Sequence, residues 1–145
     1  MEQREDILAF WKRNNALPNA EEAQKRVRQV VMMVTGSSGE VIGVSTVYPG
    51  QIQNDNREYF FYRMFIQPGD RVFGLMTAVT QKTLQFLQKA AFPDKPDGLI
   101  IVTENPKLMR KGAMARLRRL GFQLLGKNAK GMDVWLGKVK AESFD

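Results

Sequence analysis

The run Tyr59–Ile66 constrains the fold more than any other stretch, because seven of its eight residues are apolar or aromatic. Such continuity, without polar alternation, is typical of a strand buried on both faces of a sheet. Pro and Gly within Gln67–Asp70 end both strand and helix. Beyond them, apolar residues recur at three- and four-residue steps and predict one long amphipathic helix. Its predicted apolar stripe consists of Val72, Leu75, Met76, Val79, Phe86, Leu87 and Ala90.

The turn between this strand and helix has the pattern of an anion site. A glycine-bearing turn at the start of a helix exposes backbone N–H groups at the positive end of the helix dipole, where phosphate groups commonly bind. The segment Arg71–Thr77, which includes Gly74, is therefore a candidate phosphate-binding segment. An ordinary strand, turn and helix without a ligand is the alternative interpretation.

Length and composition set further limits. The chain has 145 residues, which fits a single domain over residues 1–145. No apolar run approaches the ~20 residues of a membrane helix, and Met1–Asp6 lacks a secretory pattern, so we expect a cytoplasmic protein. The chain contains no Cys and no His, which excludes disulfides, Ser–His dyads and most transition-metal sites, and we expect no metal. The net charge of +7 favours anionic partners.

The remaining pattern predicts the order αα-β-β-β-α-β-α-β-β. Because a helix separates Tyr59–Ile66 from Leu99–Thr103, we expect these two strands to be parallel, which makes a central βαβ unit. The fold class is therefore α/β (α+β), with a mixed, mostly antiparallel sheet and helices on both faces. The other predicted segments are helices 5–14 and 19–28, strands 29–35 and 40–48, a polar loop 49–56, a helix from Pro106 capped by Gly121, and strands 122–125 and 132–139.

The strand and turn resemble a motif of the GNAT N-acyltransferases. Ile66-x-Pro68-x-x-Arg71-x-x-Gly74-x-Met76 is similar to the family's acyl-CoA signature, in which a strand ends in V-x-P and [Q/R]-x-x-G-x-[G/A] opens a helix. Met76 replaces the final Gly or Ala of that signature. Val72 stands where a second Gly is usual.

A second segment resembles the same family. Ala113-x-x-x-Leu117-x-x-x-Gly121-Phe122 is similar to the family's A-x-x-x-Y-x-x-x-G-F, a helix that ends on Gly-Phe before a strand. The predicted order of elements also matches the GNAT order from its second strand onward. The resemblance spans roughly Val30–Val139.

The resemblance implies acetyl-CoA, or another short acyl-CoA, as cosubstrate and direct transfer to an amine in a ternary complex. Loop amides would hold the CoA pyrophosphate, and the end of the central strand would pair with the pantetheine arm. Asn105 is also suited to cap the helix that begins at Pro106. The residues implied in cofactor binding are Met64, Ile66, Arg71, Val72, Phe73, Gly74, Leu75, Met76, Thr77 and Asn105.

The usual general acid of the family is the tyrosine that Leu117 replaces here. Tyr62 and Tyr48 are the nearest substitutes by position. Tyr62 faces the same side of the sheet as Met64 and Ile66, because alternate residues of a strand point to the same face. Glu58 and Glu104 are the candidate bases. Glu58 lies about 7 Å further out than the family's glutamate position, so it would act through a chain of waters. A core aromatic and ordinary surface or capping carboxylates are the alternative roles.

Three functions follow, in order of preference. The first is an N-acyltransferase, and the second is a member of the family that has lost catalysis and binds acyl-CoA as a sensor or scaffold. Leu117 and Met76 favour the second. The third is a small basic nucleic-acid-binding domain, but the aromatic strand is too apolar for an exposed stacking platform. The acceptor amine stays open, and we expect a monomer or homodimer without membrane association.

Overall fold

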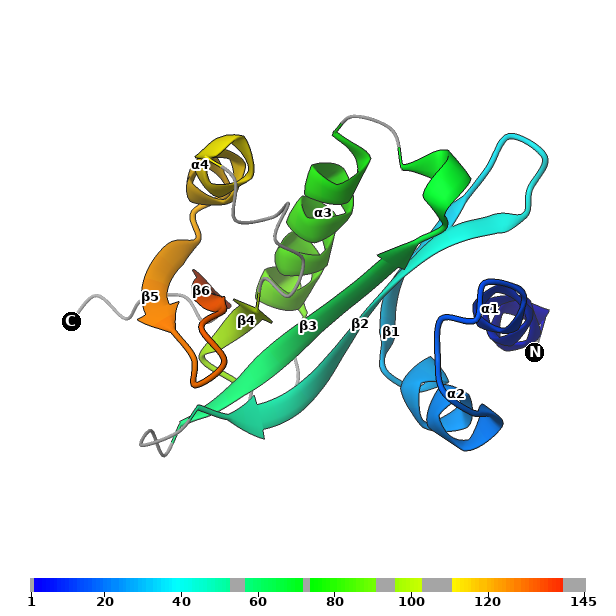
Figure 1. Ribbon diagram of the computed structural model, residues 1–145, viewed down its shortest axis with the longest axis horizontal. Helices are drawn as coiled ribbons and strands as arrows, with labels where there is room; N and C mark the ends of the chain where they lie inside the picture. The colour runs from blue at the N-terminus through cyan, green and yellow to red at the C-terminus, as the bar shows by residue number, and fades with distance from the viewer. Residues whose placement is uncertain (1, 53–56, 72–73, 91–95, 103–110, 140–145) are drawn as a thin grey trace. The chain divides into compact units, whose positions relative to one another are not determined.

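A computed structural model of the chain describes residues 2–52, 57–71, 74–90, 96–102 and 111–139. The predicted order of helices and strands is confirmed (Figure 1). The helices are α1 (Glu2–Arg13), α2 (Ala20–Val27), α3 (Leu75–Lys89) and α4 (Lys111–Arg119), and the strands are β1 (Val30–Thr35), β2 (Val41–Gln51), β3 (Glu58–Ile66), β4 (Gly98–Val102), β5 (Gln123–Lys127) and β6 (Asp133–Lys138), with a 3-10 turn η1 (Pro68–Asp70) before α3.

The six strands form one mixed sheet in the order β1-β2-β3-β4-β6-β5. Strands β3 and β4 are parallel, with Phe60 opposite Leu99 and Phe61 opposite Ile100, as the intervening helix predicted. The pairs β1–β2, β4–β6 and β5–β6 are antiparallel. The predicted α/β class, with four helices and a mixed sheet, is confirmed.

The chain divides into two compact units. The N-terminal unit comprises Met1–Val47 and Arg63–Thr83, and the C-terminal unit comprises Tyr48–Tyr62 and Leu84–Asp145. Strands β2 and β3 and helix α3 each contribute residues to both units. The assignment of one domain to residues 1–145 stays a prediction.

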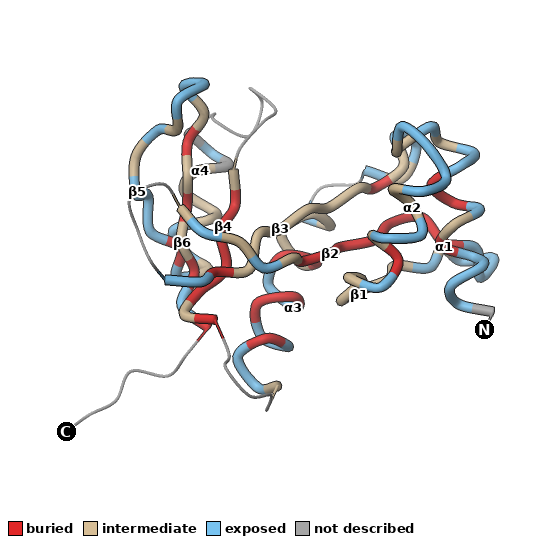
Figure 2. Tube along the Cα trace, turned by 90° about the horizontal axis from the view of Figure 1, so that it is seen from below, coloured by how far each residue is buried: buried red, intermediate tan, exposed pale blue. Residues whose placement is uncertain are grey.

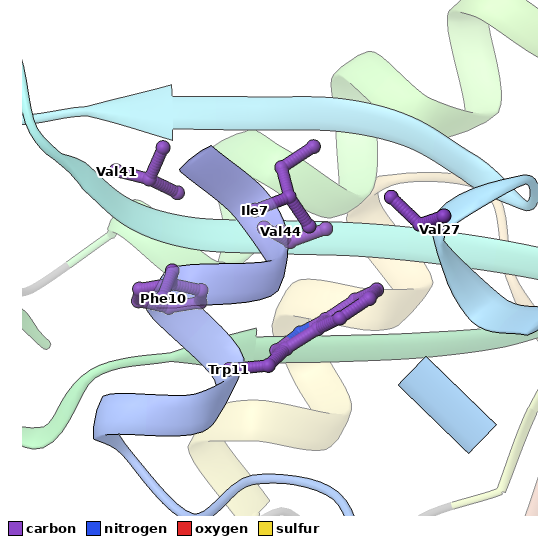
Figure 3. Close-up of a cluster of buried hydrophobic side chains, with 6 residues drawn as sticks. All are labelled: Ile7, Phe10, Trp11, Val27, Val41 and Val44. Carbon is purple, nitrogen blue, oxygen red and sulfur yellow. The ribbon is translucent and has the colours of Figure 1, made fainter. Parts of the chain in front are cut away.

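The core of the N-terminal unit forms around α1. Ile7, Phe10 and Trp11 repeat at three and four residues, which places them on one face of the helix. Figure 3 shows these side chains beside Val41 and Val44 of β2. All five are less than one-tenth exposed, so α1 is held by apolar contacts rather than by its own helix propensity.

Glu22 of α2 lies close to two arginines of the same unit. Arg26 Nε donates to Glu22 Oε1 at 2.7 Å, and Arg63 Nη1 of β3 lies 4.0 Å from the same oxygen. The hydrogen bond from Arg26 lowers the pKa of Glu22 below its usual 4.5. Glu22 therefore stays ionised at neutral pH and is neutralised locally by two arginines.

The core of the C-terminal unit forms around β4. Leu99, Ile100 and Ile101 are all buried, so consecutive residues on both faces of this strand are covered. Trp135 of β6 lies opposite Ile101 and is fully buried. Gly137, opposite Leu99, is required by close packing, because a Cβ there would lie 2.7 Å from the ring of Phe122.

The prediction that β3 is buried on both faces is wrong. Only Tyr59 and Ile66 are buried, and the six residues between them, Phe60–Phe65, are half-buried. Figure 2 shows this strand as intermediate along most of its length, whereas β2 is buried over a long stretch. Four of the six half-buried residues are aromatic, so the described residues leave apolar surface of β3 partly uncovered.

Strand β2 is longer than predicted. The predicted loop 49–56 is wrong at its start, because Pro49–Gln51 continue the strand. Tyr48 stacks on Phe61 with ring centroids 5.5 Å apart, and a Cβ at Gly50 would lie 2.9 Å from the same ring. The glycine lets an aromatic ring lie against the strand.

The buried face of α3 is also rotated from the prediction. Phe86 was expected on the apolar stripe but is 50% exposed. Thr80 and Thr83 are buried instead. Thr83 Oγ1 donates to the carbonyl of Val79 at 2.8 Å and shares a hydrogen bond of 2.9 Å with Ser45 Oγ, so its satisfied hydroxyl group occupies a face that an apolar periodicity assigns to hydrocarbon.

Candidate functional site

The candidate phosphate turn joins β3 to α3 within the N-terminal unit. Ile66 ends β3 and is 2% exposed, and the N–H of Gln67 donates to the carbonyl of Ile42 at 2.9 Å. The 3-10 turn η1 follows. Helix α3 begins at Leu75, three residues later than the predicted Val72. The strand end is therefore fixed by the sheet, and the turn lies between two regular elements.

Gly74 lies immediately before α3 and has a backbone that favours glycine. Its φ is +81°, its carbonyl accepts the N–H of Ala78 at 2.9 Å, and it is exposed. Among the described residues, a Cβ there would meet no heavy atom within 4 Å, so the requirement for glycine is conformational rather than steric. A side chain added at Gly74 would point into space that the described residues leave open.

Arg71 folds back on the strand that precedes it. Its Nε donates to the carbonyl of Ile66 at 2.7 Å, and its guanidinium carbon lies 5.6 Å from the centre of the Phe65 ring. The one carboxylate of the turn, Asp70, accepts a hydrogen bond from Gln67 Nε2. An exposed cation and a carboxylate already bound to an amide are compatible with an anion at this turn.

Several implied binding residues lie close together in the N-terminal unit. Ile66 and Arg71 are in contact, and Gly74 leads into the half-buried residues Leu75, Met76 and Thr77 of the first turn of α3. Met64 is half-buried on β3 in the same unit. Four implied site residues lie outside the described residues: Val72, Phe73, Glu104 and Asn105.

The other catalytic candidates belong to the C-terminal unit. Tyr62 is half-buried on β3, and Glu58 is exposed at the beginning of that strand. The carbonyl of Glu58 accepts the N–H of Asp97 at 3.3 Å, while the carboxylate of Asp97 lies 3.8 Å from Arg57 Nε. Tyr48 is engaged in the stack with Phe61. Glu58 is exposed, which fits a surface charge as well as a base.

The second motif has the predicted helix ending. Gly121 has φ +94°, its N–H donates to the carbonyl of Arg118 at 3.0 Å, and the N–H of Phe122 donates to the carbonyl of Leu117 at 3.0 Å. These two bonds are a Schellman cap. The role of Gly121 as the cap of this helix is confirmed. Arg118 lies over the ring of Trp135, 5.5 Å from its centre.

Two features are absent from the described part of the chain. It contains no cluster of three or more Asp and Glu side chains arranged to hold a metal ion. None of its helices is both long and apolar enough to cross a membrane.

The structure is similar to solved acetyltransferases. It matches the acetyltransferase of the GNAT family from Streptococcus pneumoniae with TM-score 0.59 and 14% identity, covering 95% of this chain and 94% of that one. A GNAT-family acetyltransferase from Bordetella pertussis matches with TM-score 0.64, 14% identity and coverage of 94% and 89%. The chain has the GNAT fold.

A third GNAT structure, a phosphinothricin acetyltransferase from Sinorhizobium meliloti solved in complex with AcCoA, matches with TM-score 0.54 and 19% identity. The alignment covers 74% of this chain and 60% of that one. No family model and no curated protein matches the sequence. The GNAT fold is therefore recognisable from the arrangement of elements, at an identity too low to transfer a substrate.

The structure contains a contact that the motif did not predict. The sequence pattern located Gly74 and the strand end, but not the contact of Arg71 with Ile66 and Phe65. The only sequence signal for it is an arginine five residues after the strand end, within reach of a carbonyl across a short turn. The pattern also gave no indication of a cavity between α1 and α2.

Proposed function

We propose that this chain is an N-acyltransferase that moves an acetyl or short acyl group from acyl-CoA to an amine, in the cytoplasm. The observation that carries the proposal is the exposed turn at Gly74, between a sheet-anchored strand end and the first turn of α3, in a chain with the GNAT fold. Backbone N–H groups at a helix start are suited to a pyrophosphate. The AcCoA bound by the phosphinothricin acetyltransferase of similar fold supports the choice of ligand.

The proposed chemistry is a direct transfer. The amine nitrogen attacks the thioester carbonyl carbon, a C–N bond forms, the C–S bond breaks, and CoA leaves as its thiolate. The amine must lose a proton, because a lysine-like amine has a pKa of ~10.4, and the thiolate must gain one. We assign proton donation to Tyr62 and proton acceptance to Glu58 or Glu104. Met64 and Ile66 would pair with the pantetheine arm.

The second candidate function is acyl-CoA binding without transfer. Two observations favour it: Leu117 replaces the tyrosine of the family motif, and the Glu58 carboxylate is exposed at the beginning of β3. A protein of this kind would bind acyl-CoA and release no CoA from it.

The test of acyl-CoA binding is Gly74→Asp, which adds a negative charge and a side chain where phosphate amides are proposed to converge. The matched control is Gly39→Asp in the β1–β2 turn of the same unit, because Gly39 also has positive φ (+85°) and a Cβ there also meets no described residue within 4 Å. Both variants therefore carry the same charge change and a similar backbone strain.

Acetyl-CoA at about 100 times its Kd should stabilise the wild-type protein by about 2.7 kcal/mol, a rise of several degrees in Tm. Gly39→Asp should keep this rise and Gly74→Asp should lose most of it. Equal rises in the two variants would place the acyl-CoA site elsewhere. Stabilisation by nucleic acid alone would favour the nucleic-acid-binding alternative.

The test of transfer is release of free CoA from acetyl-CoA in the presence of polyamines, lysine peptides and aminoglycosides. The wild-type protein should release CoA faster than Gly74→Asp. Binding of acetyl-CoA without release above that variant would favour the second candidate function.

A further inference from the structure

A cavity lies between α1 and α2, within the N-terminal unit and separate from the Gly74 turn. Its volume is about 280 Å³. Both helices and their connection contribute to it, since its lining residues fall between positions 8 and 24. These residues are Leu8, Trp11, Lys12, Asn15, Leu17, Asn19, Ala20, Ala23 and Gln24.

The connection between the helices is locked at both ends by local hydrogen bonds. At the end of α1, Asn15 has φ +49° and donates its N–H to the carbonyl of Lys12, while Ala16 donates to the carbonyl of Trp11 at 3.0 Å. This is a Schellman cap built on Asn. At the start of α2, Asn19 Oδ1 accepts the N–H of Glu22 at 2.8 Å. The cavity is therefore formed by a fixed backbone.

The size of the cavity follows from two small residues. Ala20 and Ala23 lie on the wall contributed by α2, where larger side chains would fill the space. Opposite them, Trp11 is only 4% exposed and is held in the core cluster, so its ring is a rigid wall. An apolar cavity of about 150 Å³ is known to hold benzene. A volume of about 280 Å³ therefore fits a bicyclic ring system.

The charge of the lining selects among such ligands. Lys12 is its one ionisable residue, and no carboxylate is present among the nine lining residues. Of the two acids in the first turn of α2, Glu22 is paired with Arg26 and Arg63, and neither Glu21 nor Glu22 is among the lining residues. A ligand with a negative group near Lys12 is therefore favoured over a cationic one, since the lining offers a cation no carboxylate.

We propose that this cavity binds an aromatic carboxylate of bicyclic size, with its rings against Trp11 and its carboxylate beside Lys12. The site is distinct in residues and chemistry from the acyl-CoA site of the proposed function, and it stands whether or not that function holds. For a ligand of about thirteen heavy atoms, a Kd on the order of 0.1–1 mM is expected.

The probe is 2-naphthoate, followed by ¹H–¹⁵N NMR of the full chain. The chain has two tryptophans, and the structure supplies an internal control because Trp11 lines the cavity whereas Trp135 is fully buried in the C-terminal unit. The indole N–H signal of Trp11 and the amides of Ala20 and Ala23 should shift with one common Kd, and the indole signal of Trp135 should not. The cationic isostere 2-naphthylmethylamine should bind at least tenfold more weakly.

Two sets of variants test the assignment. Ala23→Leu fills the cavity and should weaken 2-naphthoate at least tenfold. Lys12→Gln should remove the preference for carboxylate over amine, whereas Lys25→Gln, an equal charge change at an exposed position of α2 outside the lining, should leave it intact. If Ala23→Leu does not fold, the preference for carboxylate over amine in Lys12→Gln and Lys25→Gln tests the proposal without it.

The proposal fails if 2-naphthoate at 5 mM shifts none of the cavity signals, or if folded Ala23→Leu binds as the wild type does. It also fails if the amine binds as tightly as the carboxylate, or if Lys12→Gln and Lys25→Gln behave alike. Self-association of the protein in place of ligand binding, seen as concentration-dependent shifts of the same amides without any probe, would replace the small molecule by a second copy of the chain and overturn the assignment.

Discussion

The two units of the chain differ in the roles assigned to their residues. The N-terminal unit contains the strand end and the turn proposed for acyl-CoA, Met64–Thr77, while the C-terminal unit contains the proposed proton donor Tyr62 and the candidate bases Glu58 and Glu104. Binding and chemistry are therefore separable by mutation. Variants of the first set should change affinity for acyl-CoA, and variants of the second should change the rate of transfer.

The C-terminal unit carries more positive charge than the N-terminal unit, although the candidate phosphate turn lies in the N-terminal unit. The N-terminal unit has nine basic and seven acidic residues, whereas the C-terminal unit has thirteen basic and eight acidic residues, net charges of +2 and +5. The candidate phosphate turn thus belongs to the less charged unit. Its affinity for phosphate would rest on backbone amides and a helix start rather than on an excess of lysine and arginine.

The largest loss of unfolding free energy is expected from truncating a side chain in either core. Phe10→Ala in the N-terminal unit should cost about 3–5 kcal/mol and Leu99→Ala in the C-terminal unit about 2–5 kcal/mol, because both side chains are fully buried. Since β2, β3 and α3 contribute to both units, each variant should lower the Tm of one shared transition, by roughly 10–20 °C. Calorimetry checks this, with Gln3→Ala on the exposed side of α1 as the neutral control. Two separate transitions would show that the units unfold independently.

The second effect tests the assignment of chemistry to the C-terminal unit. Tyr62→Phe keeps the ring and removes the proposed proton donor, which should lower kcat by ~10²–10⁴, or about 3–5 kcal/mol. The Kd for acetyl-CoA and the Tm should barely change. In that background Leu117→Tyr, which restores the motif residue, should recover part of the rate. A kcat within twofold of the wild type for Tyr62→Phe would remove Tyr62 from the mechanism.

Local sequence patterns predicted the regular elements well. The apolar residues Leu99–Val102 lie in β4, and Gly121 and Asn19 cap helices, because each of these features depends on the residue and its immediate neighbours. The turn at Gly74 was predicted for the same reason. Its positive φ is a property of one residue.

Features that depend on distant residues were missed. Phe86 fits an apolar stripe but is exposed, because Ser45 on β2 satisfies Thr83 and so allows a polar residue on the buried face of α3. Gly50 continues β2 because the ring of Phe61 lies against it. The half-burial of Phe60–Phe65 and the cavity between α1 and α2 likewise arise from packing between segments, which periodicity along one segment does not contain.

A third, smaller effect tests how the N-terminal unit holds α3. Thr83→Val removes a buried hydroxyl and leaves Ser45 Oγ without this partner, so it should cost about 1–3 kcal/mol in unfolding free energy. Ser45→Ala should cost a similar amount. The double variant should cost less than the sum of the two single costs, because no buried hydroxyl is then left without its hydrogen-bond partner. Chemical denaturation measures all three, and additive costs would mean that the two hydroxyls act independently.

The smallest effect compares the two Schellman caps, one in each unit. Both place a residue at positive φ, but the N-terminal unit uses Asn15 (+49°) and the C-terminal unit uses Gly121 (+94°). A Cβ at Gly121 meets none of the described residues within 4 Å, so Gly121→Ala introduces backbone strain without a clash with them and should cost about 1 kcal/mol. Asn15 is already at positive φ in the wild-type protein, so Asn15→Ala adds less backbone strain and should cost only about 0.5 kcal/mol. Asn15→Gly relieves that strain and should be neutral or stabilising. Urea denaturation measures the change in unfolding free energy of each of the three variants. A larger cost for Asn15→Ala than for Gly121→Ala would mean that the Asn15 side chain, at the edge of the α1–α2 cavity, supports the helix connection beyond its backbone conformation.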